Sequence, residues 1–463
     1  MNFCRREFLK SGIASLMFGA ADGLPLFAAP AGWKPPKAKP NLVFGVLSDT
    51  HLMTGWDGKS PHKGFPHTYI LKAFDYFKQR GIDAFVHLGD AAHRGQVREI
   101  EFHREAFEKV FGKSGGPVKL LVAGNHEWFG DCERVRKIWP DEKDWKEHAL
   151  CADFARLWSQ AWGEPYAGVW HKEVKGYHFF GRHWDDKVNE MELANLVNGK
   201  ATECGLAGKK PFFILSHKRN HFQCNHALRA FPNAVAFFGH WHQSNADWKT
   251  IYFDSFGGFF PSIQCGACRM DGGNSLDGNE RVVKDTTVDG EQNWHSNKVP
   301  SRQGMVVSVY DDMVVFDRRE FGEGGALGPE WVLPLGEFAP HPFSRDALKE
   351  TIGAPEFPKG AKVAVAAAED AVRVTIPLAD GNPASRPYAY DVVVVGDDPK
   401  TKLFKSVYWE GCNLGVGHEP DKGLTFLDLS LSEIPAGKKR IFAVRPVSSL
   451  GTKGKAIATF FKA

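Results

Sequence analysis

The chain has 463 residues, more than one ordinary hydrophobic core accommodates, so two domains are expected. Apolar residues make up 43% of the chain and aromatic residues 13%, which excludes an intrinsically disordered protein. The formal net charge is +3, with both signs interspersed and no long run of Lys and Arg. The extended basic surface of a nucleic-acid-binding protein is therefore not expected.

The first residues of the chain have the pattern of an export signal. Residues 4–10 read Cys-Arg-Arg-Glu-Phe-Leu-Lys, which resembles the twin-arginine signal, and residues 11–21 are mildly apolar but too short for a permanent membrane anchor. Small residues at 29–31 offer a cleavage site. We therefore expect residues 1–31 to be a signal peptide and the mature protein to be periplasmic or extracellular, exported already folded. The alternative is a basic, frayed N-terminus.

The next part of the chain alternates between strand and helix patterns. Residues 32–40 are rich in Pro and Lys and read as a linker. We expect strands and amphipathic helices in the order 42–47, 68–80 (helix), 84–88, 97–111 (helix) and 118–123. This alternation predicts a largely parallel sheet with helices on its faces.

The alternation of strand and helix patterns is less regular after residue 127. Residues 128–165 are rich in Trp and are interpreted as an insertion near the site that could form a cap. Further short strands are expected at 174–180, 211–215 and 235–238. Residues 269–300 are polar and Gly-rich and predict a long surface loop. Residues 305–309 and 313–316 predict a β-hairpin.

The composition changes near residue 340, where several Pro residues mark a boundary. Seven short apolar runs follow: 363–367, 372–376, 389–395, 404–408, 424–429, 440–444 and 456–461. Their number and spacing resemble an Ig-like or fibronectin-III-like β-sandwich. We therefore expect one domain at 41–322 and a second, all-β domain at 340–463, with no catalytic constellation in the second.

The eight cysteines are less informative than the motifs. Cys265 and Cys268 form a lone CxxC pair, and without a second pair they do not indicate a zinc site. Two disulfide pairings and a set of small buried thiols all stay open, the pairings being Cys132 with Cys151 and Cys204 with Cys224.

Five polar motifs, each directly after a predicted strand, carry the chemistry. They are Asp49-Thr50-His51, Gly89-Asp90, Gly124-Asn125-His126-Glu127, Ser216-His217 and Gly239-His240-Trp241-His242. Any one of these polar residues alone would be read as a cap or a satisfied side chain. Because strand ends converge at one edge of a sheet, the five motifs together predict a single site.

The ligand types in these motifs suit two metal ions. The candidate ligands are Asp49, His51, Asp90, Asn125, His217, His240 and His242. Imidazole together with carboxylate favours Zn, Mn or Fe, whereas an all-oxygen set would favour Mg or Ca. Two cations can clamp the attacking and leaving oxygens of an in-line displacement at phosphorus and convert a bridging water into hydroxide.

The series of motifs closely resembles the calcineurin-like metallophosphoesterase superfamily over roughly residues 40–320. The resemblance implies a four-layer α/β/β/α sandwich holding two divalent or trivalent ions. It assigns one metal to Asp49, His51 and His242. It assigns the other to Asn125, His217 and His240. Asp90 then bridges the two metals, and His126 is the general acid or orients the phosphate.

The second motif departs from two subfamilies. Protein-phosphatase-type members read Gly-Asp-x-x-Asp-Arg-Gly there, with an Asp that supports the catalytic His, whereas this chain has His93 followed by Arg94. His93 could still hydrogen-bond His126. Arg94 could hold a phosphate oxygen or be a surface residue at a helix start. Purple acid phosphatases carry a metal-binding Tyr that is absent here, where His51 is present.

Two classes of function remain. The first is a hydrolase of phosphate mono- or diesters in the cell envelope, with a small phosphoester as substrate and a hydroxide that bridges the metals as nucleophile. The second is a non-catalytic, metal-bound scaffold. His126 favours the enzyme, because a scaffold does not need an unligated imidazole beside its metals. Metal identity, the type of ester and the oligomeric state stay open, and no nucleic-acid partner or permanent membrane anchor is expected.

Overall fold

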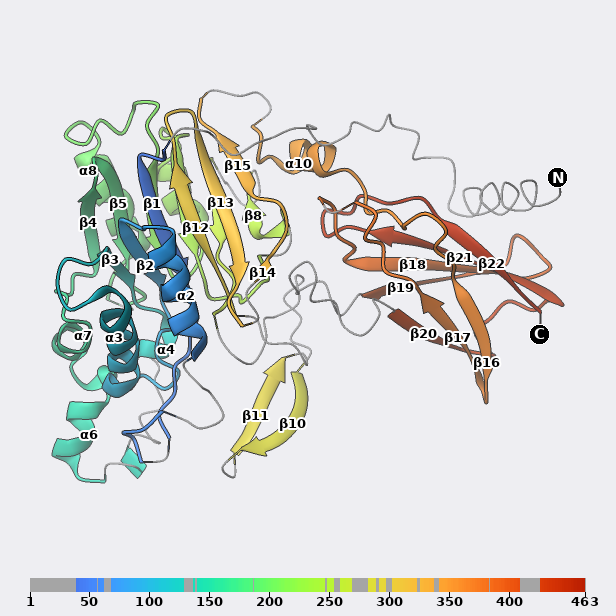
Figure 1. The fold of residues 1–463 in the computed structure, drawn as a ribbon, viewed down its shortest axis with the longest axis horizontal. Coiled ribbons are helices and arrows are strands. Elements are labelled where there is room, and N and C mark those ends of the chain that lie inside the picture. The colour runs from blue at the N-terminus through green and yellow to red at the C-terminus, as the bar shows by residue number, and fades with distance from the viewer. Residues whose placement is uncertain are drawn as a thin grey trace.

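Figure 1 shows the computed structural model of the chain. It describes residues 39–462 except 56, 62–67, 129–135, 138–139, 186, 246–247, 254–258, 269–281, 289–290, 297–301, 323–324, 337–340, 383 and 409–424. The predicted signal peptide and most of the predicted linker lie outside these residues. Within the described part of the chain, no helix has both the length and the apolar character to cross a membrane.

The first sheet is mixed and has seven strands. They are β1 (Leu42–Leu47), β2 (Ala84–Leu88), β3 (Val118–Val122), β12 (Gln303–Val309), β13 (Met313–Glu320), β14 (Gly325–Ala326) and β15 (Trp331–Pro334). Strands β1, β2 and β3 are parallel, as predicted, and β12 pairs antiparallel with β1. The predicted hairpin is formed by β12 and β13. Because β15 pairs with β13, this sheet runs on past residue 322.

The second sheet has six strands. They are β4 (Val169–Val174), β5 (Tyr177–Arg182), β6 (Phe212–Ser216), β7 (Ala234–Phe238), β8 (Ile251–Tyr252) and β9 (Ser262–Gln264), in the order β4-β5-β6-β7-β9-β8. The prediction of one strand over 174–180 is wrong. Lys175 and Gly176 have φ values of 51° and 75°, so the chain reverses there and β4 and β5 form a hairpin.

The two sheets pack face to face through aromatic side chains. The Phe44 ring meets those of Phe179, Phe213 and Phe237 edge-on, at centroid distances of 5.4, 4.9 and 5.8 Å. Helices α2 (Thr68–Gln79), α3 (Val97–Phe111) and α7 (Phe154–Trp162) cover the outer face of the first sheet. Helices α8 (Glu190–Lys200) and α9 (Phe222–Ala227) cover the second. The predicted four layers are therefore confirmed.

The described part of the Trp-rich segment contributes to the core. It contains α4 (Asn125–Trp128), α6 (Glu142–His148), a 3-10 turn (Leu150–Ala152) and α7. Trp158 and Trp162 on α7 are 1% and 0% exposed and pack beneath α3. These two aromatic residues are therefore core side chains and do not form a cap over the site.

Among the described residues, one cysteine forms a disulfide and four are free thiols. Cys151 is disulfide-bonded, and Cys132, the partner that the sequence left open for it, lies outside the described residues. Cys204, Cys224, Cys265 and Cys268 are free. The pairing of Cys204 with Cys224, left open from the sequence, is therefore wrong.

The segment predicted as a long loop contains a hairpin. Strands β10 (Val282–Val288) and β11 (Glu291–Ser296) pair antiparallel. The loop prediction is wrong for these residues, because the β-branched residues of β10 favour strand over loop. The rest of 269–300 lies outside the described residues.

The C-terminal part is an all-β sandwich, as predicted. Its strands are β16 (Ala364–Ala368), β17 (Ala371–Ile376), β18 (Ala389–Val395), β19 (Lys402–Tyr408), β20 (Thr425–Ser430), β21 (Lys439–Val447) and β22 (Ile457–Lys462). They form sheets β16-β17-β20 and β19-β18-β21-β22 around a shared core that includes Tyr390 and Phe442. Helix α10 (Arg345–Ile352) leads into it, and Leu348 and Ile352 pack in the core of the first domain.

Candidate metal centre

The five motifs meet at one edge of the two sheets. Asp49 follows β1, Asp90 follows β2 and Asn125 follows β3. His217 follows β6, and the Gly239–His242 motif follows β7. Each of these strands belongs to the parallel part of its sheet, so their carboxyl ends point the same way. The fold therefore gathers residues that are far apart in the sequence.

The candidate ligands form two groups that share one carboxylate. The first group is Asp49, His51, Asp90 and His242, and the second is Asp90, His217 and His240. Within each group the ligand atoms all lie within 4.8 Å of one another. Asp90 is buried, at 1% exposed, between the two.

Short distances connect the members of each group. In the first, His242 Nε2 lies 3.1 Å from Asp49 Oδ1 and 3.1 Å from His51 Nε2. In the second, His217 Nε2 lies 3.3 Å from Asp90 Oδ2 and 3.0 Å from Asn125 Oδ1. All seven sequence-predicted ligands are therefore brought together, with Asp90 between the two sets. That each one binds a metal stays a prediction.

The backbone of the ligand loops is strained. Six non-glycine residues have positive φ among the described residues: Asp49, His51, Asp90, Lys175, His240 and His242. Five of them are candidate ligands, with φ between 45° and 70°. Left-handed backbone costs a non-glycine residue about 1–3 kcal/mol and persists where the surrounding structure imposes it, often at functional sites.

Hydrogen bonds to the outer atoms of the ligands fix their orientation. His217 Nδ1 donates to the carbonyl oxygen of Leu88 at 2.7 Å, which leaves Nε2 free to face Asp90. The Asp49 carboxylate accepts from the backbone N–H of His240, at 3.1 and 3.0 Å. Such outer partners select the histidine tautomer and hold a ligand in the binding position.

Two turn glycines allow the loops to approach. A Cβ atom at Gly124 would collide with Asp90 Oδ1, and one at Gly239 would collide with Ser48 Oγ and Asp49 Oδ2. Neither position has room for a side chain. These glycines are therefore required by the closeness of the ligand loops as well as by their turns.

The electrostatics of the site attract positive charge. Burial alone would lower the pKa of His217, but the Asp90 carboxylate beside it raises that pKa to about 9. Burial acts against ionisation of Asp90 as well, yet His217 and His126 hold the pKa of Asp90 below its usual value. A site that favours a proton next to Asp90 also favours a cation there. Buried carboxylates with imidazole and amide donors are a suitable set for two such cations.

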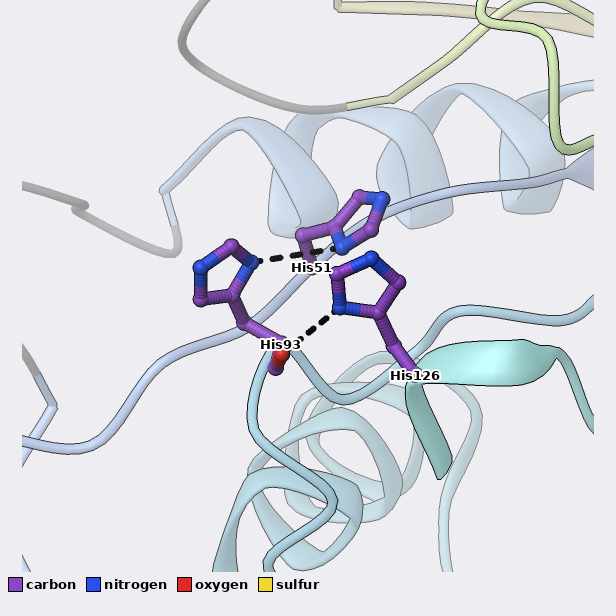
Figure 2. A group of neighbouring side chains, drawn as sticks. All are labelled: His51, His93 and His126. Atoms are coloured by element: carbon purple, nitrogen blue, oxygen red, sulfur yellow. Dashed lines mark hydrogen bonds between the residues drawn. The ribbon is translucent and has the colours of Figure 1, made fainter. Parts of the chain in front are cut away.

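His126 is held by the backbone of the neighbouring loop (Figure 2). Its Nδ1 lies 2.8 Å from the carbonyl oxygen of His93, and its Nε2 lies 4.0 Å from Asp90 Oδ2. The His93 ring stacks beside the His126 ring, while His93 Nδ1 lies 3.4 Å from His51 Nδ1. The contact that positions His126 therefore comes from the main chain of His93, whereas the sequence suggested its side chain.

Arg94 is buried instead of lying at the surface. It is 7% exposed, and its guanidinium donates to the carbonyl oxygen of Thr54 at 3.3 Å. Its backbone N–H donates to Glu99 at 2.8 Å. The alternative of a surface residue at a helix start is therefore wrong. Its role as a phosphate ligand stays a prediction.

Two buried glutamates that the sequence analysis gave no role connect the loops. Glu127 accepts from the backbone N–H groups of Asp90 (2.9 Å), Ala92 (2.8 Å) and Gly124 (2.6 Å). Burial and the Asp90 charge raise the pKa of Glu127 to about 8. Glu99 accepts from Thr54 and Arg94. The sequence signal for Glu99 is its position three residues after Gln96, which is the spacing of a capping box. The signal for Glu127 is its place in the third motif.

Trp184 forms one wall of the site and was also missed. Its ring lies 5.3 Å from that of His240 and 6.0 Å from that of His217. Lys218 Nζ lies 5.6 Å from the centroid of the Trp184 ring. The exposed ammonium of Lys218 therefore adds positive charge at the rim. No pattern in the sequence distinguishes Trp184 from the other tryptophans of the chain.

The ligand-bearing part of the chain matches a known family. Residues 42–244 match the family described as calcineurin-like phosphoesterase. This region is a calcineurin-like phosphoesterase domain. Its candidate ligand groups fit divalent metal binding. A search of curated proteins finds no match to the chain.

Several solved structures are similar to the chain. A purple acid phosphatase from yellow lupin (Lupinus luteus) seeds has 11% identity and a TM-score of 0.40, with 63% of this chain and 54% of that chain covered. GAP50, the anchor in the inner membrane complex of Plasmodium, has 11% identity and a TM-score of 0.35, covering 64% and 89%. A phosphoesterase from E. coli has 11% identity and a TM-score of 0.27, covering 63% and 98%. The chain thus spans about half the length of the lupin protein.

Proposed function

We propose that the protein hydrolyses small phosphate mono- or diesters with two metal ions. The observation that carries this proposal is the position of Asp90, which belongs to both ligand groups. A single buried carboxylate shared by two sets of imidazole ligands is the arrangement that a pair of cations requires. The family match supports the hydrolase class.

The residues would divide between two ions. Asp49, His51 and His242 would hold the first. Asn125, His217 and His240 would hold the second, with Asp90 shared. When bound, the ions would polarise the phosphoryl oxygens and acidify the water that attacks phosphorus.

The chain's own residues would position the ester and supply a proton. His126 is not needed as a ligand, its side chain is 35% exposed, and its Nε2 faces the shared carboxylate. When both ring nitrogens carry a proton, Nδ1 donates to the His93 carbonyl and Nε2 is left to give its proton to the leaving oxygen or to hold a phosphoryl oxygen. Trp184 and Lys218 would border the ester on the side of His240.

Metal content and turnover, measured on one preparation, test the proposal. The purified chain should bind two ions of Mn, Zn or Fe and hydrolyse p-nitrophenyl phosphate, bis-p-nitrophenyl phosphate or both. Asp90→Asn should lose metal affinity and activity together. The loss should exceed the about 10–100-fold that is typical when a hydrogen-bond partner of a metal ligand is replaced. Asp153→Asn, at the exposed residue that precedes α7, is the matched control and should change neither. Two ions without turnover on any ester would favour the scaffold.

We also propose that the protein is exported by the twin-arginine route. The Arg-Arg-Glu-Phe-Leu-Lys run at residues 5–10 and the apolar run after it support this proposal. Replacing both Arg5 and Arg6 by Lys should leave the chain in the cytoplasm with its N-terminus intact. Cell fractionation and the N-terminal mass of the recovered protein test this. Equal export of both forms would exclude the route.

A further inference from the structure

A second group of metal-ligand side chains lies outside the phosphoesterase site. His171 on β4, His178 on β5 and Cys204 after α8 bring two imidazoles and a thiol together. His171 Nε2 lies 3.1 Å from His178 Nδ1 and 3.8 Å from Cys204 Sγ. One ligand atom of each residue lies within 4.8 Å of the others, and all three residues are partly buried.

The fold places these side chains together through the β4–β5 hairpin and the end of α8. In the hairpin register His171 lies opposite Phe180 and His178 lies opposite Glu173, so both imidazoles are on the face that α8 covers. The His171 ring stacks on Phe180 at 4.6 Å, which anchors it. The backbone N–H of Cys204 donates to Lys200 at the end of α8, and this turn brings the thiol over the hairpin.

The group is separate from the phosphoesterase site. Strand β5 runs from Tyr177 toward Trp184, whose ring packs against His217 and His240. At about 3.3 Å per residue, His178 lies about 20 Å along the chain from Trp184. An ion at one site therefore cannot share ligands with the other.

The chemistry of the three side chains favours a borderline-soft cation. The two neighbouring imidazoles offer nitrogen lone pairs, and His171 Nε2 and His178 Nδ1 lie 3.1 Å apart. Metal binding would release the proton of the Cys204 thiol, because the thiolate is the ligand. The carboxylates of Glu173 and Glu203 are near enough to influence these groups and would partly offset an added positive charge.

We propose that His171, His178 and Cys204 bind one zinc ion. Two imidazoles and a thiolate are ligands that zinc takes in proteins, and the fourth position would face solvent or the exposed Glu203. Mg and Ca prefer oxygen ligands and do not fit. The ion would tie the turn after α8 to the β4–β5 edge of the second sheet.

Cobalt substitution tests the proposal, because a Co–thiolate bond gives a near-ultraviolet charge-transfer absorption that nitrogen and oxygen ligands do not. The full chain, stripped of metal by a chelator and kept free of oxygen, should gain this absorption on adding CoCl2, with the amplitude of one Co–thiolate bond per chain. Zinc should displace the cobalt and abolish the absorption. No such absorption in the unmodified chain would overturn the proposal.

Three variants locate the signal. Cys204→Ser should abolish it, while Cys224→Ser, which changes a buried thiol on α9, should keep it. Asp90→Asn should also keep it, although the phosphoesterase site is then damaged. This result separates the inference from the proposed function. Absorption that persists in Cys204→Ser would place the ion elsewhere.

Thermal unfolding supplies a second readout that is independent of absorption. In the Asp90→Asn background, zinc should raise the unfolding midpoint, and adding Cys204→Ser or His178→Gln should remove this increase. Circular dichroism before heating shows whether each variant is folded. An equal zinc-dependent shift with and without Cys204 would overturn the proposal.

Discussion

His126 Nδ1 lies 2.8 Å from the backbone carbonyl oxygen of His93. A main-chain acceptor cannot be removed by changing a side chain, so the orientation of the His126 ring depends on the path of the loop after β2. This loop also carries Asp90, whose Oδ1 accepts the backbone N–H of His126 at 2.9 Å. His126, the proposed proton donor, and the carboxylate of Asp90 are therefore positioned by the same segment.

Replacing His126 by Ala should keep the metals and slow hydrolysis. General acids contribute about 10²–10⁴-fold, so kcat should fall within that range for an ester with a poor leaving group. The loss should be smaller for p-nitrophenyl phosphate, whose leaving group needs less protonation than that of an alkyl phosphate. Elemental analysis and kcat on both esters check this. An equal loss on both would assign His126 to holding the phosphate, and unchanged turnover would exclude either role.

Replacing His93 by Ala should have a smaller effect than replacing His126. The carbonyl that holds His126 survives the change, whereas the contacts of the His93 ring with His51 and His126 are lost. We expect kcat to fall less than about 10-fold, below the range for a general acid. A loss as large as that of His126→Ala would mean that the His93 side chain takes part directly.

Replacing Glu127 by Gln should weaken metal binding without removing a ligand. Glu127 accepts three backbone N–H groups with two oxygens, whereas Gln offers one oxygen and an N–H₂ group. A buried donor left without an acceptor costs about 1–3 kcal/mol of stability, and loss of an outer partner lowers metal affinity about 10–100-fold. Denaturant unfolding and metal titration measure both. Glu147→Gln, at an exposed ion pair, is the control and should show neither change.

Replacing Lys218 by Ala should affect monoesters more than diesters. A monoester carries one more negative charge at neutral pH, and the Lys218 ammonium beside Trp184 is positioned to attract it. We expect KM for p-nitrophenyl phosphate to rise several-fold, at most about 5-fold for an exposed charge worth up to about 1 kcal/mol. The change for bis-p-nitrophenyl phosphate should be smaller. Equal changes for the two esters would exclude this role, and Lys187→Ala provides a control at another exposed lysine.

Acid should destabilise the protein through His183. His183 is buried, its Nδ1 accepts the backbone N–H of Ala123 at 2.9 Å, and burial lowers its pKa to about 3. The unfolded chain, with a His pKa of about 6.5, therefore binds this proton more tightly, so stability is lost as pH falls from 6.5 toward 3. Between pH 7 and pH 5 the loss from this group is about 2 kcal/mol.

The variant His183→Asn isolates the contribution of His183 to the pH dependence of stability. Asn retains an acceptor near the position of Nδ1 but does not titrate, so the loss of unfolding free energy between pH 7 and pH 5 should be about 2 kcal/mol smaller than in the unmodified protein. The exposed His226→Asn is the control and should follow the unmodified protein. An identical pH dependence in all three proteins would contradict the assignment.

The sequence by itself determined the parallel strands β1 to β3, the seven strands of the C-terminal sandwich and the identity of the polar residues that gather at the sheet edge. These depend on local patterns: apolar runs form strands, and a parallel strand must deliver its next residues to the same edge as its neighbours. The Asp49, Asp90 and His217 positions follow from that rule alone. The family resemblance then assigned these polar residues to two sets of metal ligands.

The tertiary structure decided what each side chain meets. Lys175 and Gly176 take left-handed backbone and divide a region whose alternation suggested one strand. Arg94 is buried, and it donates hydrogen bonds to Thr54 and Glu99. His126 is held by a carbonyl and not by a ring. The contacts of Arg94 with Thr54 and of His126 with His93 join different loops. Such a hydrogen bond depends on where two backbones pass in space, which no local pattern specifies.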